Sequence, residues 1–126
     1  MSKTGIFIIT LLFTIPVLLF AQIETIVINN TVFKTKSRPS VKFNHMNHME
    51  IENVACSDCH HRFVNGRNVI EPDELSDSNK TIYCSYCHNS ETKLKKAYHR
   101  LCIGCHNSMI KKNKAAGPRL CGECHK

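Results

Sequence analysis

The sequence predicts a small, mostly irregular fold with short α-helices and a short N-terminal β-hairpin, stabilised by something other than aliphatic packing. Three observations lead to this prediction. The chain has 126 residues, and after residue 21 it contains no long apolar segment. Strand-forming residues are concentrated just after that point, and eight cysteines recur in four short motifs along the rest of the chain. So small a domain makes only a marginal core and usually adds disulfides, metals or cofactors.

The N-terminus predicts export. A short polar start is followed by an apolar run from Ile6 to Ala21, after which the chain becomes polar. This order is typical of a secretory signal peptide. An uncleaved anchor fits less well, because a span needs about 20 apolar residues and this run of sixteen is interrupted by two threonines and a proline. We expect residues 1–21 to be a signal peptide and residues 22–126 to form one domain, in the periplasm or otherwise outside the cytoplasm.

Regular secondary structure is expected mainly at the start of this domain. The stretches TIVINNTVFK (25–34) and SVKF (40–43) are rich in β-branched and aromatic residues, and Ser37–Pro39 provides a turn. They predict the hairpin, after which no strand or long helix pattern persists. Glu91–Leu101 is the best helix candidate, because it has good helix formers and no glycine or proline. The polar, turn-rich Asn65–Lys80 predicts a surface loop.

The rest of the chain is organised by a motif, C-x-x-C-H, that occurs four times. The copies are CSDCH (56–60), CSYCH (84–88), CIGCH (102–106) and CGECH (121–125). Their uneven spacing argues against a solenoid with a fixed period. C-x-x-C-H is the attachment motif of c-type haem. On one helical turn both thiols face the same way and can bond the two vinyl groups of a porphyrin edge, while the histidine can reach the iron.

We therefore predict four covalently attached haem c groups. The predicted attachment residues are all eight cysteines of the chain: Cys56, Cys59, Cys84, Cys87, Cys102, Cys105, Cys121 and Cys124. The predicted proximal iron ligands are His60, His88, His106 and His125. Only eight of the 126 residues are histidines, yet one follows every cysteine pair. Chance is therefore a poor explanation of the motif.

Three other uses of paired cysteines fit less well. The fifteen residues between Cys105 and Cys121 suit a zinc ribbon, but zinc gives the motif histidines no role, and most zinc ribbons are intracellular. A disulfide framework is common in small exported domains, yet it also leaves the histidines unexplained. A thioredoxin-like redox motif needs a βαβ unit, for which the sequence shows no pattern.

The histidines outside the motifs match the remaining axial positions in number. Four irons have eight axial positions, and the chain has eight histidines. The predicted distal ligands are His45, His48, His61 and His99. Because His61 follows His60 directly and projects differently, we expect it to bind a neighbouring haem. Met46, Met49 and Met109 are rival ligands, which would raise the potential; we interpret them as packing residues.

The sequence resembles the class III multihaem cytochromes c, which are small, exported tetrahaem proteins of low potential. The matching stretch is VKFNHMNHMEIENVACSDCHH (41–61), and the resemblance continues over the other three motifs, spanning roughly residues 32–126. It implies the small multihaem cytochrome c fold, with a β-hairpin before the first histidine. It also implies the ligand pairs His45–His60, His61–His88, His48–His106 and His99–His125. The family often has two motifs widened to four intervening residues, whereas all four have two here.

If every iron carries two histidines, no coordination site is open, so the sequence predicts electron transfer rather than catalysis. Axial ligands tune haem potentials over about 0.8 V, and two histidines imply the lower part of that range. Four haems on so short a chain must lie close enough for electrons to hop between them. The alternative is a multihaem reductase with one open iron, or a subunit of a larger, membrane-associated redox complex. Prompt binding of carbon monoxide would indicate an open iron.

The charge distribution bears on the partners. Without residues 1–21 the chain has sixteen Lys and Arg against ten Asp and Glu, a net charge of +6. Eight basic residues and no acidic one lie within residues 93–119. Such a patch steers acidic partners, which favours redox proteins with an acidic docking face. An equally good alternative is that the basic residues serve only to balance the negative charges of the haem propionates. Nucleic acid also binds basic patches, but export and haem attachment argue against such a partner.

Overall fold

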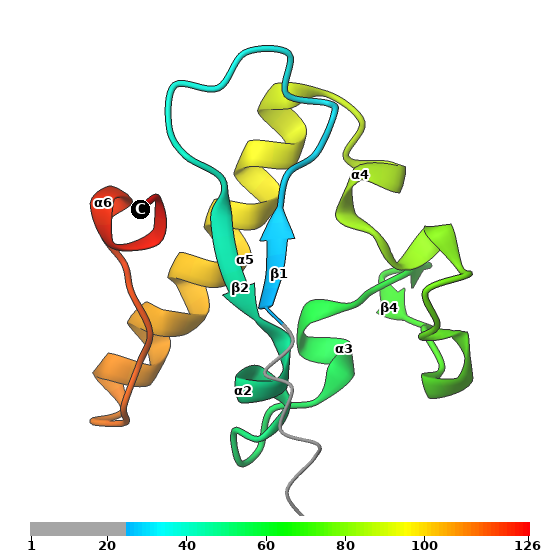
Figure 1. Cartoon of the computed structure of the whole chain (residues 1–126). Helices are drawn as coiled ribbons and strands as arrows, with labels where there is room; N and C mark the ends of the chain where they lie inside the picture. Colours follow the sequence, from blue (N-terminus) through cyan, green and yellow to red (C-terminus); the bar gives the residue numbers. More distant parts are fainter. Residues whose placement is uncertain (1–24) are drawn as a thin grey trace, which may run out of the picture.

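The computed structural model describes residues 25–126, so the predicted signal peptide lies outside the described residues. Figure 1 shows a β-hairpin in the middle, with the single-turn helix α6 to one side and α4 to the other. Apart from one long helix, the elements are short and joined by irregular segments, as the sequence predicted. Within the described part of the chain, no helix is both long and apolar enough to span a bilayer.

The predicted N-terminal hairpin is confirmed, with shorter strands and a longer connection. Strand β1 (Thr25–Ile28) pairs antiparallel with β2 (Val41–Asn44). β1 ends before residue 34 because a turn begins at Asn30, whose side-chain oxygen accepts a hydrogen bond from the Val32 N–H at 2.9 Å. The long connection reaches the start of the main helix, where the Lys34 N–H donates to Glu91 Oε1 at 2.6 Å.

The first two helices are single turns with side-chain caps. Helix α2 (His45–Met49) follows β2 directly, and the Asn44 side chain accepts a hydrogen bond from the backbone of the first turn at 2.8 Å. Helix α3 (Cys56–Cys59) carries the first C-x-x-C-H motif. The Asp58 carboxylate accepts a hydrogen bond from the Ala55 N–H at 2.8 Å. This bond satisfies a donor that a helix start would otherwise leave unpaired.

The segment after α3 contains a second hairpin, so the expectation of no further strand was wrong. Strand β3 (Phe63–Val64) pairs with β4 (Arg67–Asn68). The two residues between them, Asn65 and Gly66, both have positive φ, as a tight Asn-Gly turn requires. The 3₁₀ turns η1 (Pro72–Glu74) and η2 (Lys80–Ile82) follow. The predicted surface loop is therefore a mostly exposed segment with several short turns of its own.

The predicted helix is confirmed at its start and was wrong at its end. Helix α5 (Glu91–Lys111) begins after Ser90, whose hydroxyl accepts a hydrogen bond from the first turn at 3.4 Å. It runs ten residues past Leu101, through the third motif. The motif is itself helical, and an interior glycine such as Gly104 costs only about 1 kcal/mol. Helices α4 (Cys84–Cys87) and α6 (Cys121–Cys124) carry the second and fourth motifs as single turns.

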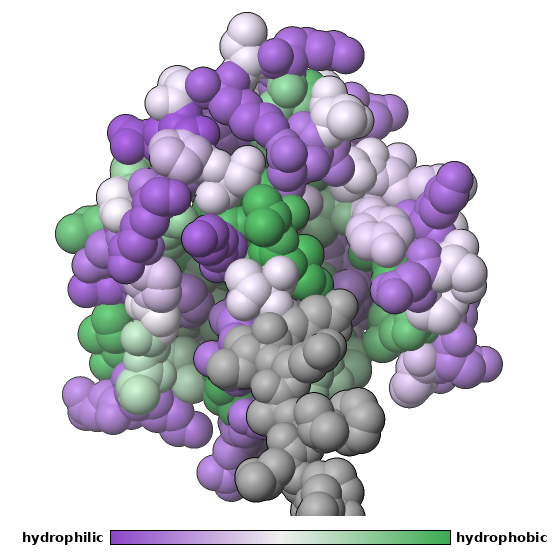
Figure 2. Space-filling view, in the orientation of Figure 1, coloured by the Kyte–Doolittle hydropathy of each residue, from purple (hydrophilic) through white to green (hydrophobic). Residues whose placement is uncertain are grey.

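Leu94 on α5 is the only fully buried side chain among residues 25–126. Large apolar side chains are left exposed elsewhere; Phe63 is 63% exposed and Leu120 is 66% exposed. Figure 2 shows apolar patches scattered over one face between hydrophilic residues. Residues 25–126 therefore have almost no core of their own, which agrees with the prediction that something other than aliphatic packing stabilises the fold.

Candidate haem-binding site

Each cysteine pair lies on one helical turn, with its histidine just beyond. The pairs span α3, α4, the middle of α5, and α6. All eight cysteines are free thiols. Within residues 25–126, no three His, Cys, Asp or Glu side chains are grouped closely enough to hold a metal ion directly. The thiols are arranged as separate pairs, which suits attachment of a porphyrin edge better than a four-sulfur site or a disulfide.

Thiols of different motifs influence one another's pKa. Burial raises the pKa of Cys59, Cys84 and Cys102, and nearby thiol charges raise the pKa of Cys59 and Cys102 further. Tyr98 lies beside Cys84, and burial together with that thiol raises the pKa of its hydroxyl to about 12. The phenol therefore stays protonated and can act as a donor.

The eight histidines lie as four pairs with nearly equal separations. The ring centroids are 6.3 Å apart in His45–His60, 6.3 Å in His61–His88, 6.2 Å in His48–His106 and 6.5 Å in His99–His125. Each pair combines one motif histidine with one histidine from outside the motifs, and these are the four pairs that the family resemblance implies. Imidazole nitrogens bind metals at about 2 Å, which places two rings on opposite sides of one iron with centroids roughly 6 Å apart. The pairs therefore fit haem iron.

The short elements explain how each histidine outside the motifs reaches its position. His45 and His48 both project from the single turn α2, and they lie beside motif histidines from different parts of the chain. His61 follows α3 and lies beside His88 rather than beside its neighbour in the sequence. His99 projects from α5 towards the fourth motif. Among the rival ligands, Met46 and Met49 are exposed.

Several of the rings are held by backbone carbonyl groups. The Nδ1 atoms lie 2.8 Å from Asn44 O for His48, 3.3 Å from Ile82 O for His60, 2.6 Å from Pro118 O for His106 and 2.7 Å from Pro39 O for His125. A carbonyl oxygen can only accept, so Nδ1 must carry the proton and donate it. In the neutral ring Nε2 then keeps its lone pair, which is the arrangement of histidines that ligate metals.

Sequence reasoning missed these carbonyl acceptors. They are backbone atoms, so no residue type marks them, and two of them lie far from their histidines in the sequence. Pro39 and His125 are 86 residues apart. The acidic caps of the single-turn helices did have a signal, because Asp58 and Glu123 occupy the same position within their motifs.

Four C-x-x-C-H turns and four histidine pairs around a nearly coreless chain define a multihaem c-type cytochrome. Comparison with known families agrees. The class III cytochrome c family matches residues 22–125, so the chain belongs to that family. Members of this family are multihaem electron carriers rather than enzymes, and they exchange electrons with redox proteins. The four cysteine pairs accordingly carry four covalent haem c groups.

Individual relatives differ greatly in length. The chain is 32% identical over 91 residues to high-molecular-weight cytochrome c of Nitratidesulfovibrio vulgaris (strain Hildenborough), a match that covers 69% of this chain and 15% of that protein. It is 28% identical over 101 residues to cytochrome c3 of Maridesulfovibrio salexigens. This match covers 71% of this chain and 80% of that protein. The chain thus spans most of the latter and a small part of the former.

A solved structure supports the fold. The crystal structure of high-molecular-weight cytochrome c from Desulfovibrio vulgaris (Miyazaki F) matches with a TM-score of 0.55 and 28% identity. The match covers 82% of this chain and 20% of that one. The predicted small multihaem cytochrome c fold, mostly irregular with short helices and a short N-terminal hairpin, is confirmed as cytochrome c3-like.

Proposed function

We propose that the chain without residues 1–21 is an exported electron carrier, periplasmic or otherwise extracytoplasmic, in which every haem iron has two histidine ligands. The observation that carries this proposal is the pairing of all eight histidines at centroid separations of 6.2 to 6.5 Å. Bound haem iron accepts and releases one electron at a time. The imidazoles occupy both axial positions, so the chain leaves no site for a substrate and keeps the same ligands in both oxidation states.

The carbonyl contacts support the same proposal. In the folded chain, the rings that donate Nδ1–H to Asn44, Ile82, Pro118 and Pro39 are each held in one orientation by that bond. A fixed ring presents Nε2 without further rearrangement, and such supporting bonds typically matter 10- to 100-fold for metal affinity or activity. The described residues therefore provide both the ligands and their support.

The partners are proposed to be redox proteins with an acidic docking face. The eight basic residues of the predicted patch are all exposed: Lys93, Lys95, Lys96, Arg100, Lys111, Lys112, Lys114 and Arg119. They lie on α5 and on the segment that leads into α6, beside the third and fourth motifs. A positive surface of this kind accelerates association with a negative one and loses that effect as salt rises.

Carbon monoxide binding tests the ligation. The exported holoprotein should have the mass of residues 22–126 plus four haems, and after reduction it should bind no carbon monoxide promptly. The variant His99→Ala should bind about one carbon monoxide per molecule, because it vacates one axial position. Met49→Leu is the matched control and should behave like the wild type. Stoichiometric binding by the wild-type protein would overturn the proposal and favour a reductase with an open iron.

A further inference from the structure

The four histidine pairs differ in how many of their rings are held by carbonyl groups. In His48–His106 both rings donate Nδ1–H, at 2.8 and 2.6 Å. The pairs of His60 and His125 each have one donating ring. Within residues 25–126, neither ring of His61–His88 has such a bond. The His48–His106 site is therefore the most strongly supported and the His61–His88 site the least.

A glycine makes the shortest of these bonds possible. A Cβ atom added at Gly117 would lie 2.5 Å from Cε1 and 2.9 Å from Nε2 of the His106 ring. Side chains do not approach this closely, so only glycine lets the backbone pass against the ring face. The next residue, Pro118, then places its carbonyl oxygen 2.6 Å from Nδ1 of the same ring.

The segment that contains Gly117 is itself held in place from the fourth motif. The Glu123 carboxylate accepts hydrogen bonds from the backbone N–H groups of Arg119 and Leu120, both at 2.9 Å. The Arg119 guanidinium also donates to the Asn107 side chain at 3.4 Å, next to His106 in the sequence. The Pro118 carbonyl is thus held from its C-terminal side through Arg119 and cannot easily follow a displaced ring.

Donation from Nδ1 changes the chemistry at Nε2. A ring that gives its proton towards a carbonyl gains basicity, and a more basic ligand stabilises ferric iron over ferrous iron. Hydrogen bonding around the ligands is one of the means by which a protein sets a haem potential. Two donating rings on one iron therefore lower its potential more than one ring or none.

We propose that Gly117 is a positioning residue that lets Pro118 hold the His106 ring, and that the His48–His106 site consequently has the lowest reduction potential of the four. The proposal rests on the proposed function, since it assumes that His48 and His106 share an iron. The site between His61 and His88 is expected to have the highest potential.

The wild-type holoprotein provides the first test. With ¹⁵N-labelled histidine, NMR of the reduced protein should show slowly exchanging Nδ1–H groups on His48 and His106 and fast exchange on His61 and His88. A redox titration followed by NMR, with each haem assigned through its ligands, should show that the His48–His106 haem is the last to be reduced. Any other haem reduced last would overturn the proposal, whether or not variants fold.

Gly117→Ala provides the second test, with Ala115→Ser as its control. Ala115 is exposed, lies on the same segment two residues before Gly117, and is outside every haem motif. In Gly117→Ala the potential of the His48–His106 haem should shift upwards and its His106 Nδ1–H should exchange faster, while the other three potentials stay in place. Ala115→Ser should shift none of the four. A purely structural role would lower thermal stability without moving one potential selectively.

The two proposals fail in different ways. If His48 and His106 bind different irons, the ligand assignment of the wild-type protein shows it before any variant is made, and the ligation scheme fails. If the pair is correct but Gly117→Ala leaves its potential unchanged, the ligation scheme stands and only the role of Gly117 is lost.

Discussion

Helix α5 and the segment from residue 61 to residue 83 are of similar length, and both connect haem motifs, yet they are held together in different ways. α5 is one continuous helix that contains Leu94, His99 and the third motif. The other segment has no helix longer than one 3₁₀ turn. Its short turns are joined by side-chain hydrogen bonds. The chain thus positions one pair of motifs with backbone regularity and another with particular polar side chains.

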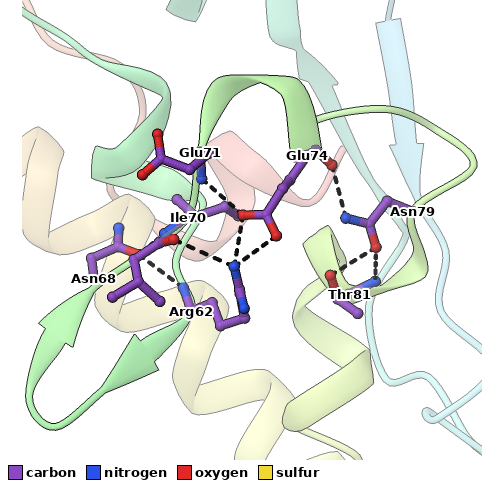
Figure 3. Close-up of polar contacts among 8 residues, drawn as sticks. Arg62, Asn68, Ile70, Glu71, Glu74, Asn79 and Thr81 are labelled. Atoms are coloured by element: carbon purple, nitrogen blue, oxygen red, sulfur yellow. Dashed lines mark hydrogen bonds and ion pairs between the residues drawn. The ribbon is translucent and has the colours of Figure 1, made fainter.

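The polar contacts of the 61–83 segment are specific (Figure 3). The Asn68 side chain accepts hydrogen bonds from the N–H groups of Arg62 and Ile70 at 2.9 and 3.3 Å, and it donates to His60 O at 3.0 Å. The Asn79 side chain donates to Glu74 O at 2.8 Å. These bonds keep the segment folded against the first motif. They bury no apolar side chain completely, so the segment has no apolar core of its own.

Haem removal should give the largest difference in residual structure between α5 and the 61–83 segment. We expect the chain made without haem attachment to lose both hairpins and the single-turn helices, because Leu94 is the only fully buried side chain among residues 25–126. Some helix should survive within residues 91–111, which exceed the length of about 12–15 residues below which isolated helices are marginal. Circular dichroism and backbone NMR shifts measure both effects. Cooperative unfolding of the haem-free chain, with hairpin shifts intact, would contradict this expectation.

Leu94→Ala should weaken the region that has some packing of its own. Removing a buried leucine side chain typically costs about 2–5 kcal/mol, and Leu94 is fully buried. We expect a loss of this size in the free energy of unfolding of the holoprotein, measured by denaturant titration. Lys95→Ala, at the exposed next position, is the control and should change stability by less than about 0.5 kcal/mol. Equal effects of the two substitutions would mean that α5 is held by its haems alone.

The sequence predicted the features that depend on local pattern. The four motifs, the first hairpin and the start of α5 follow from residue types at fixed spacing. The end of α5 could not be predicted in this way. Gly104 lowers the helix propensity of the third motif, but the motif is itself helical and the helix continues through it. The β3–β4 hairpin was missed although Asn65-Gly66 is a strong turn signal, since the flanking strands have only two residues each.

In the candidate site, too, the sequence predicted some features and left others to the tertiary structure. The sequence alone shows that eight histidines are available for eight axial positions. Only the family resemblance implied which histidines form pairs. The path of the chain brings His99 to His125 and His48 to His106, and no local pattern specifies it. The carbonyl acceptors depend on the same tertiary path, because Pro39 meets His125 across most of the domain.

The smallest effect is expected from the ion pair of the 61–83 segment. Arg62 Nη2 lies 2.6 and 2.8 Å from the two Glu74 carboxylate oxygens, and the Glu71 N–H donates to the same carboxylate at 2.9 Å (Figure 3). The Glu71 N–H, and next the Arg62 guanidinium, lower the pKa of Glu74 below its usual value of 4.5. A carboxyl group with a lowered folded-state pKa stabilises the fold above its unfolded pKa, and this stabilisation disappears as the pH falls through the folded value.

Glu74→Gln should therefore destabilise the holoprotein slightly at neutral pH, and the difference from the wild type should vanish well below pH 4.5. Denaturant unfolding at both pH values measures it. Asp73→Asn removes the charge of an exposed neighbour and should give no comparable pH-dependent difference. Because α5 has no such pair among its described contacts, the difference should be confined to the 61–83 segment, with faster amide exchange near Asn68 and unchanged exchange in residues 91–111. A uniform increase over both regions would show that the two regions unfold as one unit and that the haems, rather than the polar contacts, hold the segment in place.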